Sequence, residues 1–326
     1  VVVLVVVVVV ASVTRRADAA ERARSVVVST ITDPAITESS GLAVSTRHAD
    51  LAYTVNDSGH APVVYAIRIS TGAVVGTTQV TGVTWRDTEA MAIDGRGRVW
   101  VADLGDNEAV RRDVALYSFA EPGEGNHSTT ATRYPVSYTD GPQDVESLAI
   151  DPTTGRKIVV SKDLLNGRVL VLPRRLSTTS PNVPRPVERR TLLLATDASW
   201  SPDGRWVVVR NYLQAATLDP RTWRTVATTT LPEQPQGETL AFEPGGRSYL
   251  IGSEGTDSRL LRIGFSVRSG SAPVPTATAT PTARPDTTSE EKEGLEPSTL
   301  VLLGGVGAAG IILLGAVLLL VRRAVR

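Results

Sequence analysis

Residues 86–107, RDTEAMAIDGRGRVWVADLGDN, carry acidic groups at both ends of what reads as a pair of short strands. Glu89 lies at the start of the first strand, and Asp103, Asp106 and Asn107 follow the second. In an antiparallel pair the start of one strand lies beside the end of the next, so these groups share one edge. Clustered carboxylate and amide oxygens are the ligands that Ca²⁺ prefers. The stretch therefore predicts an edge that attracts cations.

This pattern recurs along the chain. Further copies begin at Ser40, Glu146, Thr196 and Glu238, each with a polar residue, an apolar strand, a turn rich in Asp, Pro or Gly, and a second apolar strand. Two more strand-like runs follow each of the first four copies; in the third unit they are residues 168–173 and 190–195. Four strands per unit, repeated about every 40 to 57 residues, are typical of propeller blades.

An early strand completes the last unit. Only one run, residues 259–265, follows the fifth copy, whereas residues 24–32, RSVVVSTIT, precede the first copy and lack a partner. Pairing these two runs closes the ring and removes the open sheet edges that invite aggregation. We therefore predict an all-β fold, a five-bladed β-propeller over residues 25–268 closed by an N-terminal strand. Six blades, if one unit is misdivided, and a β-sandwich are the alternatives.

The ends of the sequence differ from the repeats. Residues 300–321 form an apolar run long enough to cross a bilayer as one C-terminal transmembrane helix, and the basic residues 322–326 predict a cytoplasmic tail. Residues 1–24 read as a signal peptide or as an uncleaved N-terminal anchor. Residues 269–299 are rich in Pro and Thr and predict a disordered stalk. We predict a single-pass plasma-membrane protein, attached through the C-terminal helix, with an extracellular propeller.

Charge and cysteine content limit the partners. The 34 basic residues balance the 34 acidic ones, which gives no support to a nucleic-acid partner. The chain has no Cys, so stability must come from packing, sheet closure or bound ions. With no Cys and three His, the chain is also poorly suited to Zn²⁺. If a metal is bound, we expect Ca²⁺.

A propeller brings the equivalent ends of its strands together at the mouth of a central channel. The metal ligands that we predict there are Glu89, Glu146, Glu238, Asp103, Asn56 and Asn107. Three glutamates arranged around a channel of low dielectric constant repel one another unless a cation or basic side chains compensate their charge. Lys162 and Arg210 are the basic candidates. The glutamate charge can therefore be compensated either by internal ion pairs or by bound Ca²⁺, and both alternatives stay open.

Other side chains near the mouth are candidates for binding or catalysis. Trp85 and Arg86 precede the Glu89 strand, and their planar groups could stack on a sugar or another flat ligand. The full predicted ligand-binding set is Trp85, Arg86, Lys162, Arg210 and Tyr212. His60 is the best candidate for a general base, because histidine is the side chain that most often takes this role, and the other catalytic candidates are Glu89 and Asp103. A serine hydrolase is not expected, because no Gly-x-Ser-x-Gly motif occurs.

The repeated Glu-x-apolar-Ala-apolar-Asp pattern, the WVADLGDN strand end and the export features resemble secreted bacterial β-propellers. The similar families are the NHL, SMP-30 (gluconolactonase) and phytase-like (esterase-like) proteins, in a membrane-anchored actinobacterial form. The SMP-30 resemblance implies that Glu89, Asn56, Asn107 and Asp103 hold a divalent metal that polarises an ester carbonyl, although those enzymes normally have six blades. Two functions follow: a cell-surface protein that binds a ligand or envelope component at its acidic mouth, or a Ca²⁺-dependent extracellular hydrolase of lactones, esters or phosphoesters.

Overall fold

The computed structural model describes residues 21–22, 24–165 and 167–267, and all regular secondary structure in these ranges is β-strand. The predicted stalk, transmembrane helix and basic tail lie outside the described residues, as does the predicted signal segment except for residues 21, 22 and 24. Within the described ranges, no helix has the length and apolar character to cross a bilayer.

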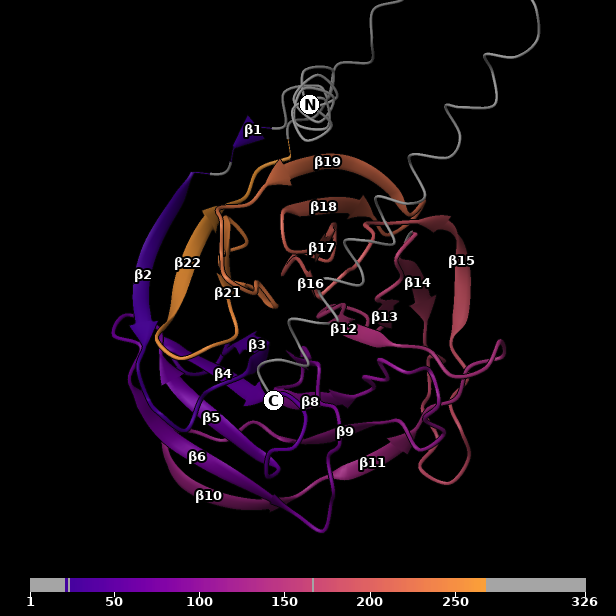
Figure 1. The fold of residues 1–326 in the computed structure, drawn as a ribbon, viewed down its shortest axis with the longest axis horizontal. Coiled ribbons are helices and arrows are strands. Elements are labelled where there is room, and N and C mark those ends of the chain that lie inside the picture. The colour runs from indigo at the N-terminus through magenta and orange to yellow at the C-terminus, as the bar shows by residue number, and fades with distance from the viewer. Residues whose placement is uncertain (1–20, 23, 166, 268–326) are drawn as a thin grey trace, which may run out of the picture. The chain divides into compact units, whose positions relative to one another are not determined.

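Five sheets surround a central axis (Figure 1). Blade 1 contains β3 (Ser39–Val44), β4 (Leu51–Asn56), β5 (Val63–Arg68) and β6 (Val74–Thr81). Blade 2 contains β7 (Ala90–Ile93), β8 (Arg98–Asp103), β9 (Ala115–Ala120) and β11 (Thr132–Pro135). Blade 3 contains β12 (Val145–Ile150), β13 (Lys157–Ser161), β14 (Arg168–Val171) and β15 (Arg185–Arg190). Blade 4 contains β16 (Asp197–Trp200), β17 (Val207–Arg210), β18 (Gln214–Asp219) and β19 (Arg224–Thr230).

Blade 5 confirms the predicted closure. Its inner strands are β20 (Thr239–Phe242), β21 (Ser248–Gly252) and β22 (Ser258–Gly264), and the N-terminal strand β2 (Ser25–Ile31) pairs antiparallel with β22. The first strands contact one another around the axis in the order β3, β7, β12, β16, β20 and back to β3. The five-bladed propeller is therefore confirmed, and the six-bladed and β-sandwich alternatives are wrong.

Three outer strands differ from the sequence prediction. The fourth strand of blade 3 is β15, with the polar sequence RPVERR, and the apolar run at 190–195 follows it. The outermost strand of a blade has an exposed face and is therefore polar here. The search for apolar runs selected residues 190–195 instead of β15. Two additional strands pair parallel with blade edges: β10 (Gly125–Thr130) with β6, and β1 (Glu21–Arg22) with β19. They cover edges that would otherwise be free.

Hydrophobic clusters between neighbouring blades hold the ring together. Trp85 packs with Tyr53 and Tyr117 between blades 1 and 2, whereas Trp100 lies in a cluster shared by blades 2 and 3. Blades 4 and 5 share a cluster around Phe242. Every strand of the five blades and all five clusters fall within residues 24–267. This range therefore contains a complete domain with its own core.

Blades 1 and 2 approach each other closely at Gly41. A Cβ atom at this position would lie 2.7 Å from the Met91 amide nitrogen and 2.9 Å from the Ala90 carbonyl carbon. Because both are backbone atoms, the blades must shift to admit a methyl group. We expect Gly41→Ala to lower the free energy of unfolding by about 1–3 kcal/mol in urea denaturation. Gly245→Ala is the control, because nothing lies within 4 Å of its Cβ position; equal stability of both variants would contradict this contact.

Candidate functional site

Three glutamates lie at the start of first strands, at one mouth of the channel. Glu89, Glu146 and Glu238 are only 3 %, 1 % and 2 % exposed. Two positions further along the strands, Met91 and Leu148 point to the same side and line an apolar cavity of about 80 Å³ in the channel. The carboxylates therefore lie above an apolar floor, where an ionised group is poorly solvated.

Lys162 neutralises one side of the mouth. It follows β13, and its Nζ donates a hydrogen bond of 2.5 Å to Oε1 of Glu146. Burial lowers the pKa of Lys162, but the charges of Glu146 and Glu238 outweigh this effect and raise it well above its usual value. The Tyr212 hydroxyl donates a 3.1 Å hydrogen bond to Oε1 of Glu238. Lys162 is thus the counterion of Glu146, with Glu238 close by.

Arg210 has a different environment. It is fully buried, and its guanidinium donates to the carbonyl oxygens of Thr239 at 3.0 Å and Gly252 at 3.3 Å and to Oε1 of Gln234 at 3.1 Å. These bonds tie blade 4 to blade 5. Burial lowers its pKa to about 10, although the charge of Glu238 opposes this effect. Arg210 forms no ion pair within 4.0 Å with a carboxylate of the described chain.

A second acidic group lies between blades 1 and 2. Carboxylate oxygens of Asp57, Asp87 and Glu89 all lie within 4.8 Å of one another. Asp57 follows β4, and Asp87 lies two residues before Glu89 on the chain that enters β7. A Cβ atom on Gly105 would lie 2.7 Å from Asp87 Oδ2 and from Glu89 Cγ, so glycine leaves room for both side chains. We call Asp57, Asp87 and Glu89 the acidic triad.

The acidic triad holds more negative charge than its surroundings compensate. Burial raises the pKa of Asp57 to about 7, and the charge of Asp87 adds to this effect. Burial also raises the pKa of Glu89 well above its usual value, helped by Glu146 and opposed by Lys162. The pKa of Asp87 is raised by burial as well, although a hydrogen bond with Asp57 opposes the shift. Near neutral pH the triad must therefore hold protons or bind a cation.

The acidic character continues around the mouth to blade 5. Burial raises the pKa of Glu254 to about 8, and the charges of Glu238 and Asp57 add to it. The Gln236 amide donates to carboxylate oxygens of both Glu238 and Glu254. Oε2 of Glu146 and Oε2 of Glu238 are buried and have no hydrogen-bond partner among the described residues. These two buried oxygens have unused capacity to accept a hydrogen bond.

The other predicted metal ligands have structural partners in this state. Asp103 accepts hydrogen bonds from the Asp87 amide at 3.0 Å and from Arg111 Nη2 at 2.8 Å, so it holds the loop that carries Asp87. Oδ1 of Asn56 accepts a hydrogen bond from the Glu38 amide. Asn107 is exposed in the loop after β8. The structure therefore brings only Glu89, of the predicted ligands, into the acidic triad.

The remaining candidates lie on the rim or in the core. Trp85 is 6 % exposed and packs against Tyr117 with ring centroids 6.1 Å apart, so its ring lies between blades and not on the mouth surface. Arg86 is exposed, and its Nη1 lies 3.4 Å from Oδ2 of Asp113. His60 lies on the rim, with Nδ1 3.4 Å from a Glu38 carboxylate oxygen.

Sequence analysis missed two residues of the mouth, Asp87 and Gln236. Asp57 and Glu254 follow second strands, a position that predicts the mouth, but they were not among the predicted ligands. Asp87 and Gln236 each lie two positions before a first-strand glutamate. In an extended chain, residues two positions apart point to the same side. The residue two positions before each glutamate could therefore have been predicted to face the mouth.

Comparisons with known proteins assign no function to this chain. No family model matches this sequence, and no curated protein matches it. Among solved structures, glutaminyl cyclase from Myxococcus xanthus is similar at 14 % identity, with a TM-score of 0.48 over 75 % of this chain and 98 % of that chain. At this level of similarity no activity carries over. The chain is a five-bladed β-propeller with an acidic channel mouth, and the resemblance to the NHL, SMP-30 and phytase-like families stays a prediction.

The raised pKa values predict how stability depends on pH. In the unfolded chain Asp57 and Glu254 ionise at their ordinary values of 3.8 and 4.5, whereas in the folded, metal-free protein they keep their protons until about pH 7 and 8. Their stabilising contribution is complete below the unfolded values and is lost as pH rises through the folded ones. We expect a lower Tm at about pH 9 than at pH 6 in chelator.

The control for this pH effect is the double variant Asp57→Asn, Glu254→Gln. Its amides imitate the protonated acids, so its Tm should change less between the two pH values. A wild-type Tm that increases with pH over this range, or an equal decrease in both proteins, would contradict the assignment.

Proposed function

We propose that this protein is a cell-surface propeller that binds a divalent cation at the acidic triad and an extracellular ligand or envelope component at the same mouth. The observation that carries the proposal is the convergence of three carboxylates within 4.8 Å, to which no basic side chain of the described residues is paired. Asp57 and Asp87 are half-buried and Glu89 is buried, so a cation can enter from the mouth and reach the deepest carboxylate.

The donor set favours Ca²⁺. Ca²⁺ accepts several oxygen ligands in flexible geometry, whereas Zn²⁺ prefers the His and Cys side chains that the triad lacks. Asp57, Asp87 and Glu89 would hold the cation, and Ser40 supports Glu89 through a 2.9 Å hydrogen bond from its hydroxyl to Oε2. A bound cation would replace the protons that the raised pKa values imply, so binding should strengthen as pH increases through about 7.

The rest of the mouth suits a polar ligand. Tyr212 and Gln236 are half-buried on the rim, and the unpartnered oxygens of Glu146 and Glu238 lie behind them. These groups accept hydrogen bonds and attract positive charge. Such a mouth supports binding of a ligand with hydroxyl or ammonium groups, next to the cation.

A Ca²⁺-dependent hydrolase is the second candidate. It is favoured by the raised pKa of Glu89, because a carboxylic acid that keeps its proton near neutral pH can act as a general acid. Of the catalytic candidates His60, Glu89 and Asp103, only Glu89 belongs to the acidic triad. Turnover of a lactone, ester or phosphoester that is lost in Glu89→Gln would support this function.

We also propose the cellular placement that the sequence suggests. Residues 300–321 would anchor the chain in the plasma membrane, and residues 269–299 would carry the propeller outside the cell.

The cation proposal is tested by the Tm of residues 24–267 at about pH 8, with chelator and with increasing Ca²⁺. A ligand at about 100 times its Kd stabilises by about 2.7 kcal/mol, which is a Tm increase of roughly 5–10 °C for a domain of this size. We expect a saturable increase with Ca²⁺ and a smaller one with Mg²⁺, which demands stricter octahedral geometry. No increase with Ca²⁺ would exclude the proposed cation site.

A further inference from the structure

The face opposite the acidic mouth carries one arginine in every blade. The turns between the first and second strands contain the sequences TRHAD, DGRGR, TTGRK, PDGRW and PGGRS. The arginines in these turns, which we call the arginine ring, are Arg47, Arg96, Arg156, Arg205 and Arg247. Because the turns lie at the far ends of the first strands from the glutamates, the arginines and the mouth glutamates lie at opposite ends of the channel.

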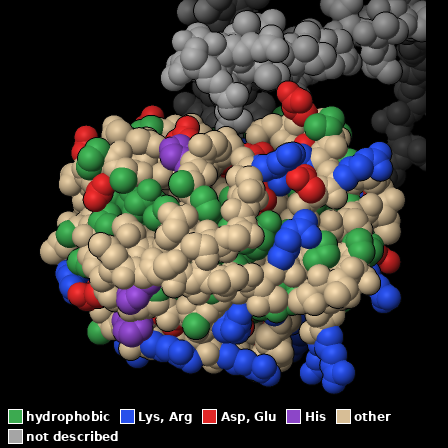
Figure 2. All heavy atoms as spheres, turned by 90° about the horizontal axis from the view of Figure 1, so that it is seen from below, with side chains coloured by type: hydrophobic (Ala, Val, Ile, Leu, Met, Phe, Trp, Pro, Cys, Tyr) green, Lys and Arg blue, Asp and Glu red, His purple; other side chains and the backbone are tan. Residues whose placement is uncertain are grey.

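The arginine ring is not neutralised locally. None of its five guanidinium groups forms an ion pair with a carboxylate of the described chain. Acidic groups in the same turns are engaged elsewhere: Asp94 accepts from the Arg98 amide and from Trp100 Nε1, and Glu243 pairs with Arg262. In Figure 2, basic side chains gather along the lower edge of the molecule. The guanidinium groups of Arg96, Arg205 and Arg247, which also make no hydrogen bond within the described chain, are therefore available to a partner.

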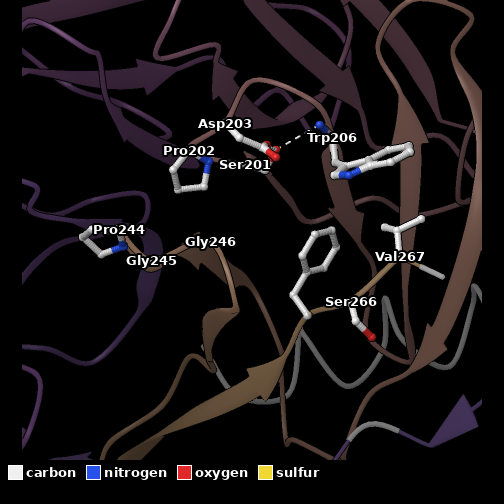
Figure 3. A pocket seen from close by; sticks show the side chains of 10 residues that line it. Ser201, Pro202, Asp203, Trp206, Pro244, Gly245, Gly246, Ser266 and Val267 are labelled. Carbon is white, nitrogen blue, oxygen red and sulfur yellow. Dashed lines mark hydrogen bonds between the residues drawn. The ribbon is translucent and has the colours of Figure 1, made fainter. Parts of the chain in front are cut away.

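A pocket lined by both apolar and polar side chains, Asp203 among them, opens on the same face between blades 4 and 5. It has a volume of about 470 Å³, and Figure 3 shows Pro202 and Pro244 on one side and Trp206 and Val267 on the other. The guanidinium carbon of Arg205 lies 5.9 Å from the centroid of the Trp206 ring. Trp206 is partly exposed, whereas the other four tryptophans are each at most 8 % exposed. A partly exposed tryptophan beside unpaired arginines is typical of a surface that contacts lipid headgroups.

The chain also leaves the propeller at this face. β22 ends at Gly264, which pairs with Ser248 next to the Arg247 turn, and Val267 lines the pocket. In the sequence, residues 268–299 then lead to the apolar run at 300–321. The arginine ring is thus on the side of the propeller from which the chain continues toward its predicted membrane segment.

We propose that the arginine ring and Trp206 bind the surface of a bilayer that contains anionic phospholipid. Phosphate groups complement unpaired guanidinium groups, and each basic side chain near such a surface strengthens binding roughly fivefold. This contact would turn the acidic mouth away from the membrane. It is independent of cation binding at the mouth, so either proposal can fail without the other.

The test uses residues 24–267 in chelator with vesicles of phosphatidylcholine alone or mixed with phosphatidylglycerol. The ring variant is Arg96→Gln, Arg205→Gln, Arg247→Gln, whose side chains make no hydrogen bond or ion pair within the described chain. The control variant is Arg185→Gln, Arg189→Gln, Arg190→Gln, which removes equal charge from the exposed strand β15. Co-sedimentation measures binding, and tryptophan emission reports on Trp206, with Trp206→Phe to assign the signal.

We expect binding to the mixed vesicles that weakens with salt, a blue shift of emission that Trp206→Phe removes, and roughly 100-fold weaker binding of the ring variant alone. Three results would each overturn the proposal: no binding to the mixed vesicles, equal loss in both arginine variants, or binding without the Trp206 signal. Binding to a soluble polyanion such as heparin without vesicle binding would also overturn it and assign the ring to another partner.

Discussion

Asp87→Asn is expected to abolish Ca²⁺ binding while leaving the fold intact. Asp87 supplies one of the three carboxylates of the acidic triad, so its loss removes a direct ligand. Loss of an outer-shell group costs roughly 10- to 100-fold in metal affinity, and loss of a direct ligand should exceed 100-fold. The amide imitates the protonated acid that the raised pKa of Asp87 favours, so the metal-free variant should be at least as stable as the wild type.

Calorimetric titration of Ca²⁺ into both proteins measures this effect. Glu108→Gln is the matched control, because Glu108 is an exposed acid in the loop after β8 and lies outside the triad. Unchanged affinity in Asp87→Asn, or an equal loss in Glu108→Gln, would show that Ca²⁺ responds to the overall acidity of the face and not to the triad.

Lys162→Met is expected to be the most destabilising change at the mouth. Lys162 forms the ion pair with buried Glu146, and the charges of Glu146 and Glu238 raise the pKa of Lys162 well above its usual value. Removing one partner of a buried pair typically costs about 3–5 kcal/mol, because an uncompensated charge remains. Burial raises the pKa of Glu146 well above its usual value, so this carboxyl can take up a proton when the amine is gone. The cost should therefore be larger at about pH 8 than at pH 5.

Denaturant unfolding at the two pH values tests this prediction. The double variant Lys162→Met, Glu146→Gln removes both members of the pair, so it should recover most of the lost stability and lose the pH dependence. If the single variant is as stable as the wild type at about pH 8, Glu146 is not held ionised by Lys162.

The propeller could be predicted because the pattern that forms each blade can be read from short stretches of sequence. Each blade repeats alternating apolar strands and tight turns, and β2 had no partner except the last blade. The fourth strand of blade 3 could not be found in this way, since RPVERR is exposed and pairs only because β14 offers a free edge.

The site was less predictable because it depends on contacts between blades. Glu89, Glu146 and Glu238 occupy equivalent positions and could be placed at one mouth from the repeat alone. The approach of Asp57 to Asp87 joins two blades through side-chain geometry, which no sequence spacing encodes. Likewise Lys162 and Arg210 both lie at the ends of second strands, yet only Lys162 turns toward a glutamate while Arg210 binds carbonyl oxygens.

Anomalous diffraction from crystals of residues 24–267, grown near pH 8 and soaked with a Ca²⁺ substitute such as a lanthanide, tests the central claim most directly. The structure predicts one strong peak bound by carboxylate oxygens of Asp57, Asp87 and Glu89. A peak at Glu238 and Glu254 instead, or no peak at the mouth, would contradict the assignment of the acidic triad as a cation site.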